Sequence, residues 1–434
     1  MEMYKGNCGH RMITLVSILS LCTVIQGCDR SEMIAHFNNL PTADVIGEMQ
    51  NTDPSTEMTG MGDGMSPTEY VEAAGENLTE TAGSILKEYG GPKVTLVMVG
   101  DILLHTPVAE SGVQEDGSYN FDALFANVKE EILAADLALV NQEVIIGGKE
   151  LDVSGYPSFN APYELGDALV EAGFDVVLHA TNHALDQGKK GVRNCLSFWE
   201  EHYPEIAVLG INGSQEAQDE EIYVYEQDGI RIAILNYTYG TNGIAMPSDM
   251  PYAVNLLEEE KVISDIARAR EQADFIVACP HWGTEYQLVP SAEQERWTEL
   301  FLDQGVDLVL GTHPHVIEPI EWIPRGDGTD GMLVYYSLGN FVNWTASSGE
   351  GIANRMVGGM AKITIGMEDG EAFIVDYGVE PLVCHLTEGT NGVTTYLFSD
   401  YTDELAQENA IIRQDSAFSR EYCDNLCEEV WGNQ

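Results

Sequence analysis

Side chains that can hold a metal ion or carry a proton follow several short apolar runs of this sequence. They are Asp101, Glu143, Asn182, His183, His281, His313 and His315. Borderline cations such as Mn²⁺, Fe²⁺ and Zn²⁺ accept imidazole nitrogen together with carboxylate or amide oxygen. A carboxylate that bridges two such ions about 4 Å apart suits the displacement reaction at a phosphoester. The set therefore predicts a site for one or two divalent transition metal ions (Mn, Fe or Zn).

Each of these residues also has an ordinary explanation when it is taken alone. An aspartate after a strand and a glycine often belongs to a turn, and Asn182 alone would be read as a turn residue. A single histidine beside an apolar run usually belongs to the core or to the surface. His313 and His315 are more specific, because period two in a strand would place both side chains on one face. The occurrence of the whole set at five strand ends favours the metal site.

The elements that must position these residues are short strands that alternate with amphipathic helices. The strand candidates are residues 94–100, 137–144, 175–182, 231–239, 275–282, 307–314 and 332–341. Most are continuous apolar runs, which indicates strands covered on both faces. Helices are predicted at 162–172, 256–272 and 291–304, the last from a capping-box pattern that begins at Ser291. This alternation is typical of an α/β domain, in which the carboxyl ends of the strands form the ligand crevice.

The end of the predicted domain differs from the rest. Residues 361–367 and 373–383 read as a hairpin around the turn at 368–371, which indicates an antiparallel edge or a second sheet. We assign residues 385–434 to a C-terminal extension that is predominantly helical. Cys423 and Cys427 would be neighbours on such a helix, and a bridge between them is one possibility.

Six motifs in order carry a resemblance to a known family. They are VGDILLH, NQEV, TNHALDQGKKGV, HWGTEYQLVPSAEQ, GTHPHVIEPIEW and YSLGNFV, between residues 94 and 345. Together they resemble the CapA-type capsule and poly-γ-glutamate synthesis proteins (PGA_cap) of the calcineurin-like metallophosphoesterase superfamily. The resemblance implies an α/β fold in which two mixed sheets pack face to face with helices outside, a four-layer α-β-β-α sandwich over residues 91–384.

The resemblance also implies roles for the site residues. Asp101 and His315 match ligands of a first metal, Glu143 the carboxylate that bridges both, and Asn182, His281 and His313 ligands of a second metal. His183 matches the histidine that gives a proton or hydrogen bond to the leaving oxygen. Asp186 could hold His183 in one tautomer, or equally cap the next helix.

One position departs from the superfamily pattern. Leu103 stands where the superfamily usually has a histidine ligand of the first metal. His105 could substitute for it, or could only bond to a neighbouring loop. The departure puts catalysis by two metals in doubt.

A second group of residues has weaker signals. Trp282, Glu285 and Tyr286 follow a predicted ligand and could line a substrate cleft, although ordinary packing would also explain them. Asn340 could form a hydrogen bond near the site. Arg355 is one of few cations in this part of the chain and is a weak candidate for contact with an anionic substrate.

The first residues read as a targeting signal. Lys5, His10 and Arg11 precede the apolar run 12–25, which is too short to span a bilayer, and Cys28 follows it. The pattern resembles a bacterial lipoprotein signal over 1–28 with Cys28 as the lipidated residue; plain secretion and an uncleaved anchor are the alternatives. Residues 29–90 read as a flexible acidic tether with a short helix at 66–89.

The charge of the chain limits its partners. It carries 71 acidic and 20 basic residues, a formal net charge of −51, which excludes nucleic acid and argues against holding a polyanion without intervening cations. We expect a lipid-anchored protein on the extracellular face of the cell membrane, or a secreted one, with capsule or polyglutamate synthase components as partners. Its predicted function is that of a metal-dependent, phosphoesterase-like hydrolase in capsule or poly-γ-glutamate synthesis or export. The alternative is a non-catalytic polymer-binding or assembly module with a vestigial metal site.

Overall fold

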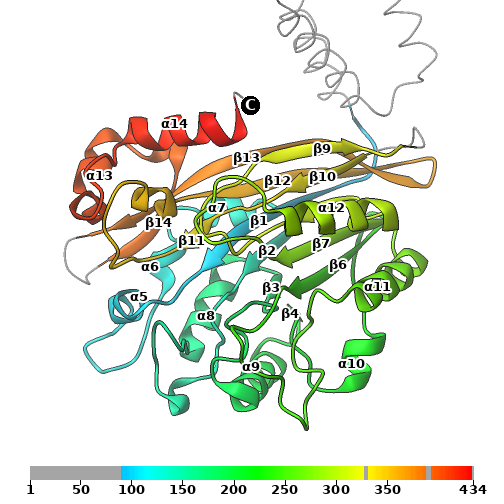
Figure 1. Ribbon diagram of the computed structural model, residues 1–434, viewed down its shortest axis with the longest axis horizontal. Coiled ribbons are helices and arrows are strands. Elements are labelled where there is room, and N and C mark those ends of the chain that lie inside the picture. The colour runs from blue at the N-terminus through cyan, green and yellow to red at the C-terminus, as the bar shows by residue number, and fades with distance from the viewer. Residues whose placement is uncertain (1–88, 327–330, 388–391, 433–434) are drawn as a thin grey trace, which may run out of the picture. The chain divides into compact units, whose positions relative to one another are not determined.

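The computed structural model describes residues 89–326, 331–387 and 392–432, and residues 92–434 form one compact unit (Figure 1). The predicted signal with Cys28, the tether up to residue 88 and nearly all of the helix predicted at 66–89 lie outside the described residues. Within the described ranges, no helix is both long and apolar enough to cross a membrane.

The first sheet is mixed and carries the N-terminal strand near its centre. Its order is β14-β13-β12-β1-β2-β3-β4, and β11 pairs with β1. The strands are β1 (Lys93–Ile102), β2 (Leu137–Asn141), β3 (Val176–Leu178), β4 (Ala207–Leu209), β11 (Asn340–Val342), β12 (Val357–Glu368), β13 (Glu371–Leu386) and β14 (Val393–Leu397). The strands β1 to β4 run parallel, whereas β12, β13 and β14 are antiparallel to their neighbours.

The second sheet is also mixed, with the order β5-β6-β7-β8-β10-β9. Its strands are β5 (Tyr223–Gln227), β6 (Ile230–Thr238), β7 (Phe275–His281), β8 (Leu308–Leu310), β9 (Ile320–Pro324) and β10 (Gly331–Tyr335). One buried cluster contains side chains of both sheets, including Leu96 and Leu139 of the first and Ile232 and Val277 of the second. The two sheets therefore pack face to face on an apolar layer.

Helices cover the outer faces of both sheets (Figure 1). The α-helices of the described residues are α5 (Thr106–Ser111), α6 (Asp122–Phe125), α7 (Lys129–Leu133), α8 (Tyr163–Ala172), α9 (Gly188–His202), α10 (Gln215–Glu220), α11 (Glu259–Gln272), α12 (Ala292–Gln304), α13 (Asp403–Glu408) and α14 (Arg420–Trp431), of which α10 has no buried residue. Residues of α5 to α9, α13 and α14 share a buried cluster with the first sheet. Residues of α11 and α12 share another with the second sheet. The predicted four-layer α-β-β-α sandwich of two mixed sheets is confirmed.

Local signals in the sequence explain where the predicted helices begin. Pro162 precedes α8, whose apolar face is buried. Ser291 caps α12 through the reciprocal hydrogen bonds of a capping box with Gln294, as its sequence pattern predicts. The helix α11 begins at Glu259, three residues later than predicted.

The strand predicted at 332–341 is wrong in one respect, because this segment contributes to both sheets. Its first part is β10 of the second sheet, and its last residues begin β11 of the first sheet. The chain crosses between the sheets at Gly339, which has φ 62°. The carbonyl oxygen of Gly339 would lie only 1.9 Å from a Cβ atom at Gly100, so this close approach requires glycine at position 100. An uninterrupted apolar pattern cannot reveal such a crossing.

The sheet continues past the predicted boundary at residue 384. The strand β13 runs to Leu386, and β14 pairs with it. The following residues are helical except for short connections, and α14 contributes Cys423 and Cys427 to the core of the first sheet. Both cysteines are free thiols.

Glu318 is a buried carboxyl group outside the candidate site. One oxygen accepts a hydrogen bond from Gln294 Nε2 at 2.5 Å, and the other has no partner among the described residues. Burial raises the pKa of Glu318 to about 8. A glutamate in an unfolded chain has a pKa of about 4.3, so the folded state binds this proton more tightly. Stability is therefore lost as the pH rises from the unfolded pKa towards the folded pKa.

We expect Glu318→Gln to remove this loss. Between about pH 5 and pH 9, the free energy of unfolding of the wild type should fall by about 2–5 kcal/mol more than that of the variant. Urea unfolding at a series of pH values measures the difference. Parallel pH profiles for the two proteins would contradict the assignment.

Candidate metal centre

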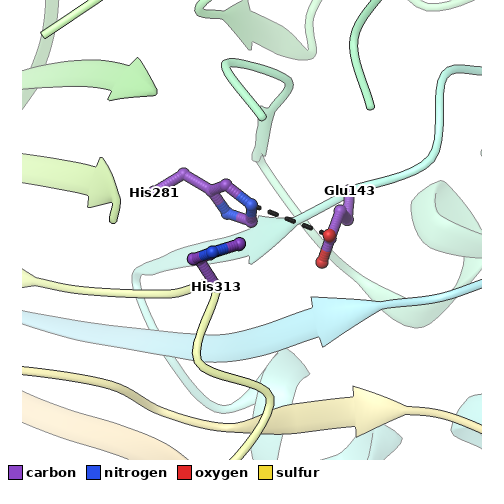
Figure 2. A group of neighbouring side chains, drawn as sticks. All are labelled: Glu143, His281 and His313. Atoms are coloured by element: carbon purple, nitrogen blue, oxygen red, sulfur yellow. Dashed lines mark ion pairs between the residues drawn. The ribbon is translucent and has the colours of Figure 1, made fainter. Parts of the chain in front are cut away.

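Two groups of buried side chains meet the geometric requirement for a metal ion. One is formed by Glu143, His281 and His313, and the other by Asp101, Glu143 and His315. Within each group, the three ligand atoms lie within 4.8 Å of one another. Glu143 belongs to both groups, and Figure 2 shows its carboxylate facing the imidazole of His281.

Both sheets contribute to this centre at the carboxyl ends of their strands. Asp101 is the next-to-last residue of β1, and Glu143 follows β2 by two residues. His281 is the last residue of β7, and His313 and His315 lie in the loop after β8. Since parallel strands end at the same edge of a sheet, residues far apart in the sequence converge there.

The carboxylate of Glu143 lies between two imidazoles. Its Oε1 atom is 3.7 Å from His281 Nε2 and 3.7 Å from His315 Nε2. Both of its oxygens are buried and have no hydrogen-bond partner within the described ranges. Burial, and then the neighbouring Asp101, Glu285 and Asp186 carboxylates, raise the pKa of Glu143 well above its ordinary value, against the opposing effect of His315. A buried carboxylate without partners is costly unless a cation compensates it.

Asp101 is held by a network around the other group. Asn141 Nδ2 donates to Asp101 Oδ1 at 2.8 Å, and His315 Nδ1 lies 3.0 Å from Asp101 Oδ2. Asn340 Nδ2 donates to the carbonyl oxygen of His315 at 3.0 Å, and its Oδ1 lies 3.2 Å from His315 Nδ1. Burial alone would lower the pKa of His315, but the carboxylates of Glu143 and Asp101 raise it to about 9. Asn340 thus contacts the predicted ligand His315 directly.

His281 and His313 have the protonation state that a metal ligand needs. Burial, and then neighbouring histidines, hold the pKa of both imidazoles well below the ordinary value, which keeps a lone pair available. The Nδ1 atom of His281 lies 3.1 Å from Thr312 Oγ1, while its Nε2 lies 2.9 Å from Asn182 Oδ1. The Nδ1 atom of His313 is buried without a partner among the described residues. Asn182 therefore presents its oxygen beside this group.

His313 and His315 both reach the site, but the prediction that a strand aligns their side chains is wrong. The strand β8 ends at Leu310, so strand alternation does not align them. Both residues instead have positive φ, 98° and 59°, which aims their side chains from a loop. Such a conformation costs a non-glycine residue about 1–3 kcal/mol and is concentrated at functional sites.

His183 and Asp186 form a pair beside the two groups. His183 Nδ1 lies 2.7 Å from Asp186 Oδ2, which also accepts from the backbone N–H of Phe159 at 2.7 Å. The ring of Phe159 packs edge-on against His183 with centroids 4.7 Å apart. The backbone N–H of Phe159 and the His183 ring thus hold Asp186 in place. Asp186 thus contacts Nδ1 of His183, the contact needed to hold this imidazole in one tautomer.

The other predicted residues lie in three places: on the exposed edge of the metal centre, beside it, and in the core. Tyr286 is 42% exposed, and its ring lies 5.9 Å from that of His315; the exposed Glu285 precedes it. His105 belongs to neither ligand group and packs against Phe159, and burial lowers its pKa to about 4. The substrate role considered for Trp282 is wrong. Its side chain is 1% exposed, belongs to the core under the second sheet, and donates from Nε1 to the carbonyl oxygen of Tyr336.

Three further residues of the site were not among the candidates. Asn141 contacts Asp101, and the ring of Tyr239 lies 4.6 Å from that of His313. Asn242 accepts from Asn182 Nδ2 at 3.2 Å, and its own Nδ2 lies 3.5 Å from both ring nitrogens of His183. Tyr239 and Asn242 follow β6, so the polar residues after that strand were the signal that could have found them.

The donor set fits divalent transition metal ions. It combines imidazoles, carboxylates and an amide oxygen, which is the mixture that Mn²⁺, Fe²⁺ and Zn²⁺ accept. The unpartnered oxygens of Glu143 and Nδ1 of His313 are the atoms that an ion would satisfy. The cysteine closest in sequence, Cys279, belongs to the core between the sheets and to neither group.

A family model and two known relatives point to the same family. The model described as "Bacterial capsule synthesis protein PGA_cap" matches residues 95–345, more than half of the chain. The capsule biosynthesis protein CapA of Bacillus anthracis is 29% identical over 273 residues, which cover 60% of this chain and 63% of that protein. The PGA biosynthesis protein CapA of Bacillus subtilis (strain 168) is 30% identical over 268 residues, which cover 60% of this chain and 67% of that protein. The chain thus matches less than two thirds of the Bacillus anthracis relative.

Solved structures give looser matches. The calcineurin-like phosphoesterase YfkN from Bacillus subtilis is 13% identical with a TM-score of 0.37, covering 77% of this chain and 100% of that chain. A 5′-nucleotidase precursor from Thermus thermophilus is 15% identical with a TM-score of 0.40, covering 67% of this chain and 54% of that chain.

Proposed function

We propose, from the premise that this chain belongs to the bacterial capsule synthesis protein family PGA_cap, that it is a metal-dependent hydrolase of the phosphoesterase type that acts in capsule formation. The observation that carries the proposal is the carboxylate of Glu143, which two groups of potential ligands share. A shared carboxylate beside three histidines suits a pair of divalent ions better than a single structural ion.

The residues of the chain would hold such ions in two places. Asp101 and His315 would bind one ion, His281 and His313 the other with the oxygen of Asn182, and Glu143 both. When bound, ions of this kind polarise a phosphoryl group and promote attack by water near neutral pH.

His183 is the residue proposed to deliver a proton. Its Nδ1 is engaged by Asp186 at 2.7 Å, so its Nε2 is the atom that can serve the leaving oxygen. Asp186 is in turn fixed by the backbone of Phe159, which keeps the imidazole in one orientation. The pair is a positioned general acid beside the metal groups.

A second candidate function is a polymer-binding or assembly module with a vestigial metal site. Leu103 favours it, because this residue is buried in the apolar core and offers no ligand where the superfamily has a histidine. Without a histidine at position 103, the first group consists of Asp101, Glu143 and His315, which supply three ligands. The engaged pair of His183 and Asp186 favours the hydrolase, since a binding module has no use for an oriented acid.

The cell-surface setting and the partners remain predictions. Attachment to the membrane depends on Cys28, and residues 1–28 lie outside the described residues. We propose a lipid-anchored protein on the extracellular face that works with capsule or polyglutamate synthase components. Fractionation of cells that produce the full-length chain tests the membrane attachment.

Removal of metal is the experiment that tests the proposed function. We expect the purified chain to contain one or two equivalents of Mn, Fe or Zn by elemental analysis, and to hydrolyse bis(4-nitrophenyl) phosphate. Chelation should abolish the hydrolysis and lower the free energy of unfolding by about 3–4 kcal/mol, as expected for an ion present at roughly 100 to 1,000 times its Kd. Return of Mn²⁺ should restore both. Bound metal without any hydrolysis would favour the assembly module.

A further inference from the structure

Arg355 is a half-buried cation near the metal centre that forms no ion pair among the described residues. The arginines that pair with an acid within 4.0 Å are Arg231, Arg268, Arg270, Arg296 and Arg325. Arg355 instead places its guanidinium carbon 3.5 Å from the centre of the Tyr286 ring. The charge of Arg355 thus has no carboxylate partner within 4.0 Å in the described part of the chain.

The guanidinium of Arg355 has unused hydrogen-bond donors. Its Nη1 donates to Thr345 Oγ1 at 3.4 Å, and its Nε is buried with no partner in the described part of the chain. A guanidinium carries five N–H groups, and a buried donor without an acceptor is costly. The stacking on Tyr286 uses the face of the guanidinium, so a planar acceptor would bind through the N–H groups on its edge.

The position of Arg355 is tied to the loop that carries the predicted ligands. Asn340 Nδ2 donates to the carbonyl oxygen of Arg355 at 2.9 Å and to that of His315 at 3.0 Å. The backbone N–H of Tyr286 donates to the carbonyl oxygen of Pro314 at 2.7 Å. Both this contact and the 5.9 Å approach of the Tyr286 ring to His315 place the stacked pair at the rim of the metal centre.

We propose that Arg355, stacked on Tyr286, binds a carboxylate of the substrate beside the scissile ester. This inference rests on the proposed function, and it adds a substrate feature that the metal centre does not define. A guanidinium edge matches a carboxylate through two parallel hydrogen bonds. One guanidinium balances one negative charge, which fits a carboxylate better than a phosphate dianion.

A purely structural role is the alternative for Arg355. In that case the guanidinium only holds the Tyr286 ring, and its loss lowers turnover of every substrate alike. A carboxylate receptor instead changes the preference between two substrates that differ only in that charge. The ratio of two kcat/KM values therefore separates the roles.

The test uses two diesters of 4-nitrophenyl phosphate, one with a 2-carboxyethyl group and one with a 2-carbamoylethyl group. They have nearly the same shape and differ by one charge. We expect the wild-type chain to prefer the carboxylate by about 10-fold or more in kcat/KM, as two charge-assisted hydrogen bonds allow. The preference should fall to about 1 in Arg355→Gln and return in part in Arg355→Lys.

Arg296→Gln is the matched control, because Arg296 also stacks on an aromatic ring, that of Trp297, but pairs with Glu293 on the outer helix α12. This variant should keep the wild-type preference. An equal kcat/KM for both diesters in the wild type, or an unchanged preference in Arg355→Gln, overturns the proposal.

Failure of the proposed function gives a different result. If neither diester is hydrolysed, the same pair of compounds is titrated calorimetrically into the metal-loaded chain. Tighter binding of the carboxylate compound that is lost in Arg355→Gln upholds the receptor without hydrolysis. Equal binding of the two compounds overturns it.

Discussion

If the centre holds the two ions proposed above, replacement of Glu143 by glutamine should remove both and reduce hydrolysis by roughly 10³-fold or more. The carboxylate belongs to both ligand groups, and its oxygens have no other partner among the described residues. Loss of an outer-shell partner alone costs about 10–100-fold in metal affinity, so loss of a shared ligand should cost more. Without ions, several kcal/mol of charge stabilisation in the transition state disappears. Elemental analysis and initial rates measure the two effects.

Two comparisons make this result specific. His281→Ala should weaken one group and leave Asp101, Glu143 and His315 in place, so it should lose one ion where Glu143→Gln loses both. Glu318→Gln, which changes another fully buried glutamate outside both groups, should retain metal and activity. A Glu143→Gln protein that keeps two ions with a native circular dichroism spectrum would falsify the shared-ligand assignment.

Replacement of His183 by alanine should lower kcat by about 10²–10⁴-fold while the metal content stays unchanged. The residue belongs to neither ligand group, and its Nδ1 is engaged by Asp186 at 2.7 Å. Asp186→Asn should lower kcat by a smaller factor, roughly 10-fold or more, because it disturbs the orientation of the imidazole rather than removing it. Steady-state kinetics on a phosphodiester, with elemental analysis of each protein, measures both predictions.

The leaving group provides a further readout for His183. A general acid matters most when the leaving oxygen is basic, so the loss in His183→Ala should be larger for an alkyl ester than for a 4-nitrophenyl ester. His202→Ala is the control, because this histidine is exposed on α9 and lies in neither group. Equal losses for both esters, or loss of metal in His183→Ala, would assign His183 to another role.

The apolar runs of the sequence predicted an α/β domain and the strand ends where the site lies, whereas the arrangement of two sheets face to face came from the family resemblance. A run such as 94–100 leaves few alternatives to a buried strand, and the polar residue that follows it must lie where the strand ends. Asp101, Glu143 and His281 reach the site for this reason. The convergence of strands from two sheets came from the family resemblance, since no local pattern specifies which strand ends meet.

The remaining differences arise where backbone conformation, rather than hydrophobic pattern, decides the outcome. His313 and His315 depend on positive φ values in a loop, which their residue types do not announce. Trp282 was placed at the site because it follows His281, whereas its side chain points into the core. Tyr239 and Asn242 depend on the course of the loop after β6, and loops follow local turn chemistry that is weakly encoded.

The metal centre combines buried ligand residues at strand ends with exposed residues on the surrounding loops. Asp101, Glu143 and His281 are fully buried at strand ends, whereas Tyr286 and Tyr239 are 42% and 46% exposed on loops. Loops accept substitutions and insertions that strand ends do not. Relatives can therefore share the reaction and diverge in the compound they bind, and an exchange of residues 239–250 or 284–290 between relatives is a route to altered selectivity. In this chain, the residues of the rim are therefore where substrate selectivity would be set.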